Sequence, residues 1–147
     1  MKYPHTPYFK FSPSVDKEDV RESGYFNINN FINKDIIFTT KMDGSNCVMT
    51  SKHIAARNGK TVDHKSFDYA KVLHSQIHAL IPENHHVFGE WLYAEQKITN
   101  GHEGIVVRTK EAFKDFDNNV AKYVRRNHVQ TDEHWSKQKI IRNILKS

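Results

Sequence analysis

The run Asp35-Ile36-Ile37-Phe38-Thr39-Thr40-Lys41 most constrains the fold, because it ends just before an Asp-Gly pair. Its β-branched and aromatic residues are typical of a strand, and residues 46–50 resemble it in composition. Between the two runs, Asp43-Gly44 is a turn signal. The pattern therefore predicts a β-hairpin, and it places the amine of Lys41 at the mouth of a sheet.

The rest of the chain predicts further short strands and few helices. Residues 67–80 carry apolar side chains at helical spacing before Pro82, which predicts a helix. The aromatic residues of an extended lead-in over residues 1–15 are interpreted as core anchors rather than as platforms that stack on bases. The other predicted elements are strands over 53–57, 86–93, 104–108 and 120–124, a short helical turn over 16–22, and a basic helix over 131–145. This order of elements is typical of an antiparallel α+β fold.

Length and composition indicate a globular chain with one core. The 147 residues fit a single domain over residues 1–147 with no separate C-terminal domain. No apolar run approaches the ~20 residues that a bilayer-spanning helix needs, and the N-terminus lacks the apolar region of a signal peptide. The single cysteine, Cys47, excludes an internal disulfide and a cysteine-based zinc site. We therefore expect a cytoplasmic monomer that does not bind membranes.

The chain is basic, with a formal net charge of +5 and ten further histidines. A surplus of positive charge favours a polyanionic partner such as nucleic acid. The charge alone fits equally well a protein that is simply basic.

Lys41 has the placement of a nucleophile. A free lysine amine has a pKa of about 10.4 and is protonated at neutral pH, so neighbouring cations or burial must lower the pKa before such an amine attacks phosphorus. Arg57, Lys122 and Arg125 are candidates for these cations. From the residues alone, the alternative is a solvated lysine at the end of a strand.

Three other charged residues lie in or beside apolar strands. Glu90 interrupts an apolar run, where a carboxylate is either paired to a cation or directed at a sugar hydroxyl or a metal. Glu103 precedes the apolar strand 104–108 and offers the hard oxygen ligands that Mg²⁺ and Mn²⁺ prefer. Lys122 is placed to neutralise charge on a transferring phosphate. The plainer alternatives are an exposed acid, a charge pair that flanks a core strand, and an ordinary surface cation.

At these residues the chain resembles the RNA ligase family of covalent nucleotidyltransferases. Lys41-Met42-Asp43-Gly44 resembles the nucleotidyl-lysine motif, and Phe88-Gly89-Glu90 resembles the motif whose acid contacts the ribose. Glu103-Gly104-Ile105-Val106-Val107-Arg108 resembles the metal-associated acidic motif, and Lys122 resembles the phosphate-contacting lysine of the last motif. Arg57 resembles the arginine that contacts the ribose or a 5′-phosphate. The resemblance covers about residues 1–140, including a C-terminal signature of a phage and bacterial subgroup over residues 122–135.

The resemblance implies an ATP-dependent RNA ligase on an antiparallel-sheet, ATP-grasp-like nucleotidyltransferase domain with flanking helices. Lys41 would attack the α-phosphorus of ATP and hold AMP as a phosphoramidate. The AMP would pass to a 5′-phosphate end, which a 3′-hydroxyl would then seal. Glu103 would hold Mg²⁺ or Mn²⁺. The nucleotide-binding residues implied are Lys41, Asp43, Gly44, Arg57, Glu90 and Lys122, and the nucleic-acid-binding residues are Arg57, Arg125 and Arg126, with RNA as the favoured partner.

The chain departs from the family pattern in two places. The family has a long segment, including an adenine-stacking aromatic residue, between the acids that Glu90 and Glu103 resemble, whereas only Trp91 to His102 lie between them here. We therefore hypothesise that a segment is missing after about Ala94. The last motif often carries a second lysine two residues after the first, but position 124 is valine. The second cation is then Arg125 or is absent.

Other functions compete with this interpretation. A DNA ligase or a capping-type guanylyltransferase would use the same lysine chemistry. From a different class, the chain would be a nucleic-acid-binding module without turnover, because the nucleotide pocket looks incomplete.

Overall fold

The structure, a computed structural model, describes residues 3–57, 59–93 and 102–126. The chain folds into two compact units. The described part of unit 1 comprises Tyr3 and residues 43–93 without position 58, and that of unit 2 comprises residues 4–42 and 102–126. Within the described residues, no helix combines the length and the apolar character that crossing a membrane requires.

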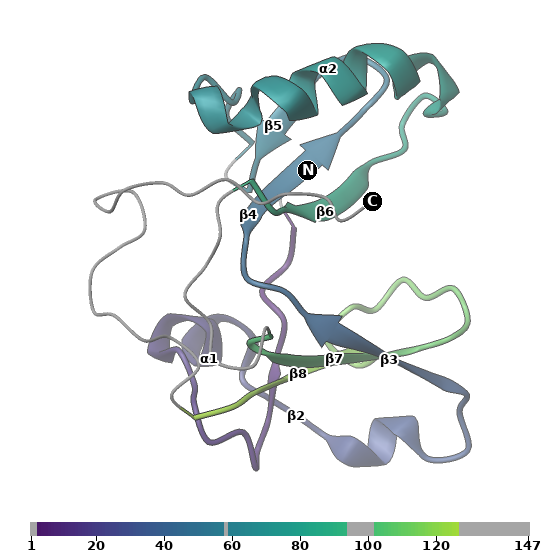
Figure 1. The fold of residues 1–147 in the computed structure, drawn as a ribbon. Helices are drawn as coiled ribbons and strands as arrows, with labels where there is room; N and C mark the ends of the chain where they lie inside the picture. The colour runs from purple at the N-terminus through teal and green to yellow at the C-terminus, as the bar shows by residue number, and fades with distance from the viewer. Residues whose placement is uncertain (1–2, 58, 94–101, 127–147) are drawn as a thin grey trace, which may run out of the picture. The chain divides into compact units, whose positions relative to one another are not determined.

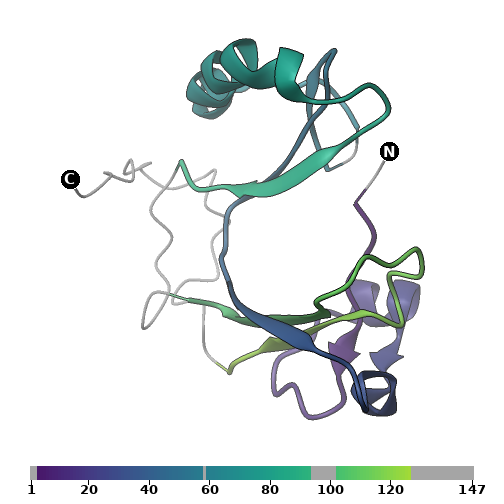
Figure 2. The same cartoon turned by 90° about the vertical axis from the view of Figure 1, so that its right-hand side faces the viewer.

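Unit 2 is built on a five-stranded mixed sheet with the strand order β2-β1-β8-β7-β3. The pairs β3–β7 and β7–β8 are antiparallel, whereas β1 pairs in parallel with both β2 and β8. In Figure 2 the blue strand β3, the green β7 and the yellow-green β8 lie side by side. The elements are β1 (Tyr8–Phe9), α1 (Lys17–Ser23), β2 (Tyr25–Phe26), the 3₁₀ turn η1 (Ile28–Phe31), β3 (Ile36–Lys41), β7 (Gly104–Thr109) and β8 (Val120–Val124).

Unit 1 contains a three-stranded antiparallel sheet in the order β5-β4-β6. The helix α2 lies along this sheet (Figure 1), and its Ala70 packs in a core with Cys47, Met49 and Phe67. The elements are β4 (Ser45–Met49), β5 (Ile54–Ala56), the 3₁₀ turn η2 (Lys65–Phe67), α2 (Asp68–Ile77), the 3₁₀ turn η3 (His78–Leu80) and β6 (Val87–Trp91).

The α+β prediction is confirmed. The predicted helix over 67–80 corresponds to α2 followed by the 3₁₀ turn η3, and each predicted strand overlaps an observed one, whereas β1 and β2 were not predicted. The antiparallel expectation holds for all pairs of unit 1 but only for part of unit 2, because β1 pairs in parallel. The expected single core is wrong, because each unit has a core cluster of its own. The assignment to a nucleotidyltransferase fold and the single-domain boundaries stay predictions. The predicted terminal helix and the proposed junction after Ala94 lie outside the described residues.

The predicted hairpin around Asp43-Gly44 is wrong. Strand β3 pairs with β7, and β4 pairs with β5 and β6, so the two runs do not pair with each other. Gly44 runs against the end of β6, where an added Cβ would lie 3.0 Å from the carbonyl oxygen of Trp91 and 2.8 Å from Leu92 Cδ2. The Asp-Gly pair therefore lies in the segment that connects β3 to β4. Gly44 is needed for the close approach to β6 rather than for a hairpin turn.

Candidate functional site

The ends of three neighbouring strands lie side by side at one end of the unit 2 sheet. Lys41 ends β3 and pairs with Gly104 at the start of β7, and Gly104 pairs in turn with Val124 at the end of β8. The Glu103 N–H donates to the Lys41 carbonyl at 3.0 Å, and the Arg125 N–H donates to the Glu103 carbonyl at 3.2 Å. Backbone hydrogen bonds thus hold Lys41, Glu103 and Arg125 in one row, although 62 positions separate Lys41 from Glu103 in sequence.

The side chains of Lys41 and Glu103 form an ion pair at this end of the sheet. Lys41 Nζ donates to Glu103 Oε2, and the two side chains are only 22% and 14% exposed. The Coulombic attraction between two charges shielded from water is larger than that between exposed charges. The Lys41 amine is therefore paired with a carboxylate and largely shielded from water. The alternative interpretation, a solvated lysine at the end of a strand, does not describe it.

Lys122 lies on the same face of the sheet as Lys41. Partners in a β-ladder point to the same face and side chains alternate along each strand, so the pairs Lys41–Gly104–Val124 and Thr39–Val106–Lys122 share one face. The opposite face carries the core residues Val107 and Ala121. The sheet thus separates a charged face from an apolar one.

Lys122 itself is buried and paired. It is 6% exposed, its Nζ donates to Asp19 Oδ2 of α1, and it lies 4.1 Å from the centroid of the Tyr8 ring. The other carboxylate oxygen of Asp19 is hydrogen-bonded to His5 Nδ1. The ordinary-surface-cation interpretation of Lys122 is therefore wrong, because its amine is enclosed by an acid and an aromatic ring.

Burial and charge shift the pKa values of this pair in ways that can be separated. Burial lowers the pKa of Lys122 and outweighs the opposing attraction of Asp19, and the positive charge of Lys41 lowers it further. Burial would raise the pKa of Asp19, but the hydrogen bonds and charges of Lys122 and His5 outweigh burial and lower it below its ordinary 3.8.

The lowered pKa of Asp19 predicts a contribution to acid stability. A carboxylate with a depressed folded-state pKa stabilises the fold above its unfolded pKa of 3.8, and the contribution is lost as the pH falls through the folded value. We expect the free energy of unfolding of the wild type to fall more steeply below that pH than that of Asp19→Asn. Urea unfolding at a series of pH values measures this, and equal slopes in the two proteins would contradict it.

The arginines that the sequence predicted for nucleic acid follow β8. Arg125 Nε donates to the His102 carbonyl at 2.8 Å, which ties this side chain to the segment that leads into Glu103. Arg126 is exposed. Val124, at the position where the family often has a second lysine, is 3% exposed. Of the two arginines, Arg125 is the one whose backbone N–H bonds the Glu103 carbonyl.

Four of the predicted nucleotide-binding residues belong to unit 1. Glu90 on β6 is exposed and pairs with Asn46 on β4, so both side chains lie on the face opposite the core residue Cys47. Arg57 is half-buried directly after β5. Asp43 and Gly44 precede β4. Burial, and secondarily the charge of Glu90, raises the pKa of the Cys47 thiol, which fits the role of Cys47 as a core residue.

The sequence reasoning missed three polar residues. Asp19 bonds the Lys122 amine and His5 bonds Asp19, but 103 positions separate Asp19 from that lysine, and no local pattern marks such a pair. Asn46 Oδ1 is buried and has no hydrogen-bond partner within the described part of the chain. Burying a hydrogen-bond acceptor without a donor costs free energy of folding. The position of Asn46 directly after Lys41–Ser45 was the signal in the sequence that could have identified it.

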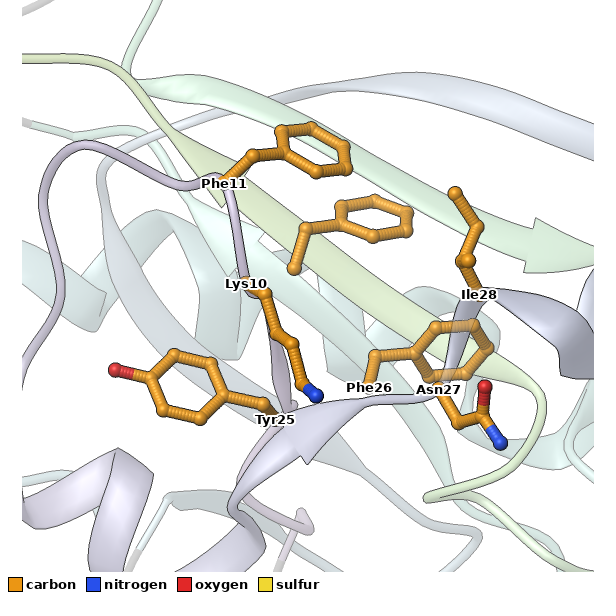
Figure 3. Close-up of a pocket in the computed structure, with 7 residues that line it drawn as sticks. Lys10, Phe11, Tyr25, Phe26, Asn27 and Ile28 are labelled. Atoms are coloured by element: carbon orange, nitrogen blue, oxygen red, sulfur yellow. The ribbon is translucent and has the colours of Figure 1, made fainter.

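An apolar cavity of about 400 Å³ lies elsewhere in unit 2 (Figure 3). Its floor contains Phe9 and Phe26, which are 5% and 3% exposed, and Phe9 and Phe11 stack with their centroids 4.9 Å apart. Tyr8 and Phe9 confirm the interpretation of the lead-in aromatics as core anchors, whereas Phe11 is 63% exposed. The cavity is lined by Phe9, Lys10, Phe11, Tyr25, Phe26, Asn27 and Ile28.

The described residues contain no group of three or more histidine, cysteine or acidic side chains that would form a protein-only metal site. Mg²⁺ is more often held by one or two carboxylates together with substrate phosphates. Glu103, which directly precedes β7, provides such a carboxylate, with the cation Lys41 beside it. The donor set fits a cation that arrives with a phosphorylated substrate.

Comparison with known proteins gives one match. The family model described as RNA ligase matches residues 34–102, just under half of the chain, and supports the resemblance over that stretch. The matched stretch includes Lys41, Arg57 and Glu90 and ends directly before Glu103. No curated protein and no solved structure matches the chain.

Proposed function

We propose that this chain, whose match over residues 34–102 supports its assignment to the RNA ligase family, is an ATP-dependent RNA ligase that uses Lys41 as its nucleophile. The family match indicates ligase activity and a nucleic-acid substrate. The observation that carries the proposal is the ion pair between Lys41 and Glu103, on the same sheet face as the buried Lys122. Lys41 and Glu103, 62 positions apart in sequence, are thereby neighbours in the fold, and this supports the proposal.

The proposed chemistry has three steps, each of which forms one bond to phosphorus and breaks another. In the first, the Lys41 nitrogen attacks the α-phosphorus of ATP; an N–P bond forms, the bond to pyrophosphate breaks and the amine loses a proton. In the second, an oxygen of a 5′-phosphate attacks the AMP phosphorus and regenerates the lysine. In the third, a 3′-hydroxyl attacks the activated 5′-phosphorus, loses its proton and releases AMP.

The residues of unit 2 have distinct proposed roles. Glu103 orients the Lys41 amine before ATP binds and would hold Mg²⁺ or Mn²⁺ that enters with the triphosphate. The metal would supply positive charge that offsets the charge of the phosphates. Lys122 would neutralise a phosphate oxygen from the same sheet face, and Arg125 and Arg126 would contact the nucleic-acid strand.

The residues of unit 1 are proposed to bind the nucleotide and the 5′-phosphate end of the nucleic acid. Glu90 has the exposed carboxylate that a ribose hydroxyl would require, and Arg57 suits a sugar or a 5′-phosphate because its guanidinium binds phosphate in a bidentate manner. Asp43 and Gly44 would shape the backbone between Lys41 and β4.

The proposal is tested by incubating the purified protein with α-labelled ATP or GTP and either Mg²⁺ or Mn²⁺. We expect a labelled protein band with ATP that survives a denaturing gel and loses its label in acid, because a phosphoramidate is labile in acid. A band that forms with GTP in preference to ATP would instead indicate a capping-type enzyme. No band under any of these conditions would leave a binding module without turnover. Sealing of matched nicked RNA and nicked DNA then separates the two kinds of ligase.

Glu103→Gln is expected to slow formation of the ATP adduct roughly a hundredfold. The amide keeps the size of the side chain but carries no charge to orient Lys41 or to hold a divalent cation. The initial rate of labelling measures the effect. Glu111→Gln, which removes an exposed acid shortly after β7, is the matched control and should label at the wild-type rate. Wild-type labelling by Glu103→Gln would remove Glu103 from the site.

A further inference from the structure

A small ionic cluster encloses the amine of Lys122 and joins three parts of unit 2. Lys122 comes from β8, Asp19 from α1, and His5 from the segment before β1. Asp19 hydrogen-bonds Lys122 Nζ through Oδ2 and His5 Nδ1 through Oδ1. The side chains of His5, Asp19 and Lys122 are 18%, 15% and 8% exposed. The cluster is therefore largely shielded from water, and Tyr8 covers Lys122 from another direction.

The helix that carries Asp19 is fixed at both ends. Asp16 caps its N-terminus by accepting from the N–H groups of Glu18 at 2.7 Å and Asp19 at 3.1 Å. The Asp16 N–H donates to the Tyr8 hydroxyl at 3.1 Å. At the other end, Ser23 Oγ donates to the His5 carbonyl at 2.7 Å. The position of the Asp19 carboxylate is thus fixed by the helix, and its hydrogen bond to Lys122 restricts the position of the lysine amine.

Holding the amine matters because lysine is long and flexible. A lysine side chain loses rotamer entropy when it is ordered, and a group ordered before its ligand arrives does not incur that loss on binding. An ammonium has several N–H donors, so a hydrogen bond to Asp19 leaves donors for a phosphate oxygen. A buried lysine without a counter-charge would also favour its neutral form, which cannot neutralise phosphate.

We propose that Asp19 and His5 are positioning residues, which hold the Lys122 amine charged and in place to meet a phosphate of the bound nucleotide. The inference rests on the proposed ligase function. It adds two residues from the N-terminal part of the chain, before the matched stretch that begins at position 34, to a site that the motifs placed at Lys41 and beyond.

A double-mutant cycle tests the proposal. The rate constant of adduct formation with α-labelled ATP is measured at saturating ATP for the wild type, Asp19→Ala, Lys122→Ala and the double variant. We expect Asp19→Ala to slow the step roughly 10- to 100-fold in the wild-type background. In the Lys122→Ala background the same change should alter the rate by no more than about twofold, because Asp19 would act only through Lys122. His5→Gln should give a smaller loss that also disappears in the Lys122→Ala background.

Controls separate positioning from folding and from the function itself. Glu22→Gln removes an acid from the same helix that is 51% exposed, and it should keep the wild-type rate. Asp19→Asn preserves the size of the side chain and serves if Asp19→Ala does not fold; we expect it to be slow but folded at the assay temperature. A purely structural role would slow the reaction by the same factor in both backgrounds, and that result would overturn the inference. Wild-type rates in both Asp19 variants would overturn it too, whereas an unlabelled wild type would refute the proposed function and the inference together.

Discussion

Lys41→Ala should abolish formation of the ATP adduct, lowering the rate by at least about a thousandfold. The substitution removes the nitrogen that would form the N–P bond, and no neighbouring group restores that bond. Lys122, the other lysine on this face, is held by Asp19 and is not expected to replace Lys41. Labelling with α-labelled ATP, followed by denaturing electrophoresis, measures the loss.

Lys41→Arg provides the matched control for this prediction. Arginine retains the positive charge and the potential pairing with Glu103, but its guanidinium is a poor nucleophile because it stays protonated. We expect this variant to keep the thermal stability of the wild type while it remains as inactive as Lys41→Ala. Lys34→Ala removes an exposed lysine that contacts Asn119 and should label normally. Substantial labelling of either Lys41 variant would be incompatible with the proposed nucleophile.

Gly104→Ala should produce the largest loss of stability among glycine substitutions at the described positions. An added Cβ would lie 1.9 Å from the carbonyl oxygen of Tyr123 and 3.1 Å from Val124 Cα. Both contacts involve the backbone of β8, which cannot turn aside as a flexible side chain can, so β7 and β8 must move apart. We expect a loss in the free energy of unfolding on the order of 2–4 kcal/mol, measured by urea denaturation.

The same substitution should impair the site, because Gly104 pairs with Lys41 on one side and Val124 on the other. Gly89→Ala is the control for stability: nothing lies within 4 Å of its added Cβ, and β6 belongs to the other sheet. A change of no more than about 1 kcal/mol is expected there. Equal stability losses at the two glycines would show that the β7–β8 spacing is not as tight as described.

The sequence predicted the elements better than their pairing. The β-branched run that ends at Lys41 and the apolar run 104–108 were identifiable because composition and local periodicity mark a strand. Their pairing with each other was not, since the Asp43-Gly44 signal favoured the nearer partner. A turn residue such as glycine indicates a local requirement of the backbone and does not identify the partner strand. At Gly44 the requirement is the close approach to Trp91 and not a hairpin turn.

The candidate site shows a similar division. Lys41, Glu103 and Lys122 stood out because charged residues in or beside apolar strands need a reason. Asp19 lies on a short polar helix whose sequence resembles any solvated surface turn, and His5 lies in a proline-containing lead-in. Asp19 contacts Lys122, and His5 contacts Asp19, where β1 pairs in parallel with β8 at Tyr8 and Lys122. A long-range pairing of a two-residue strand leaves no periodic trace in the sequence.

The central claim, that Lys41 accepts AMP, is tested most directly by locating the modification. The purified wild-type protein is incubated with ATP and Mg²⁺, digested at neutral to alkaline pH to preserve the N–P bond, and its peptides are sequenced by mass spectrometry. We expect one AMP group, carried by Lys41. An AMP group on another residue such as Lys122, or unmodified Lys41 in a protein that seals RNA, would contradict it.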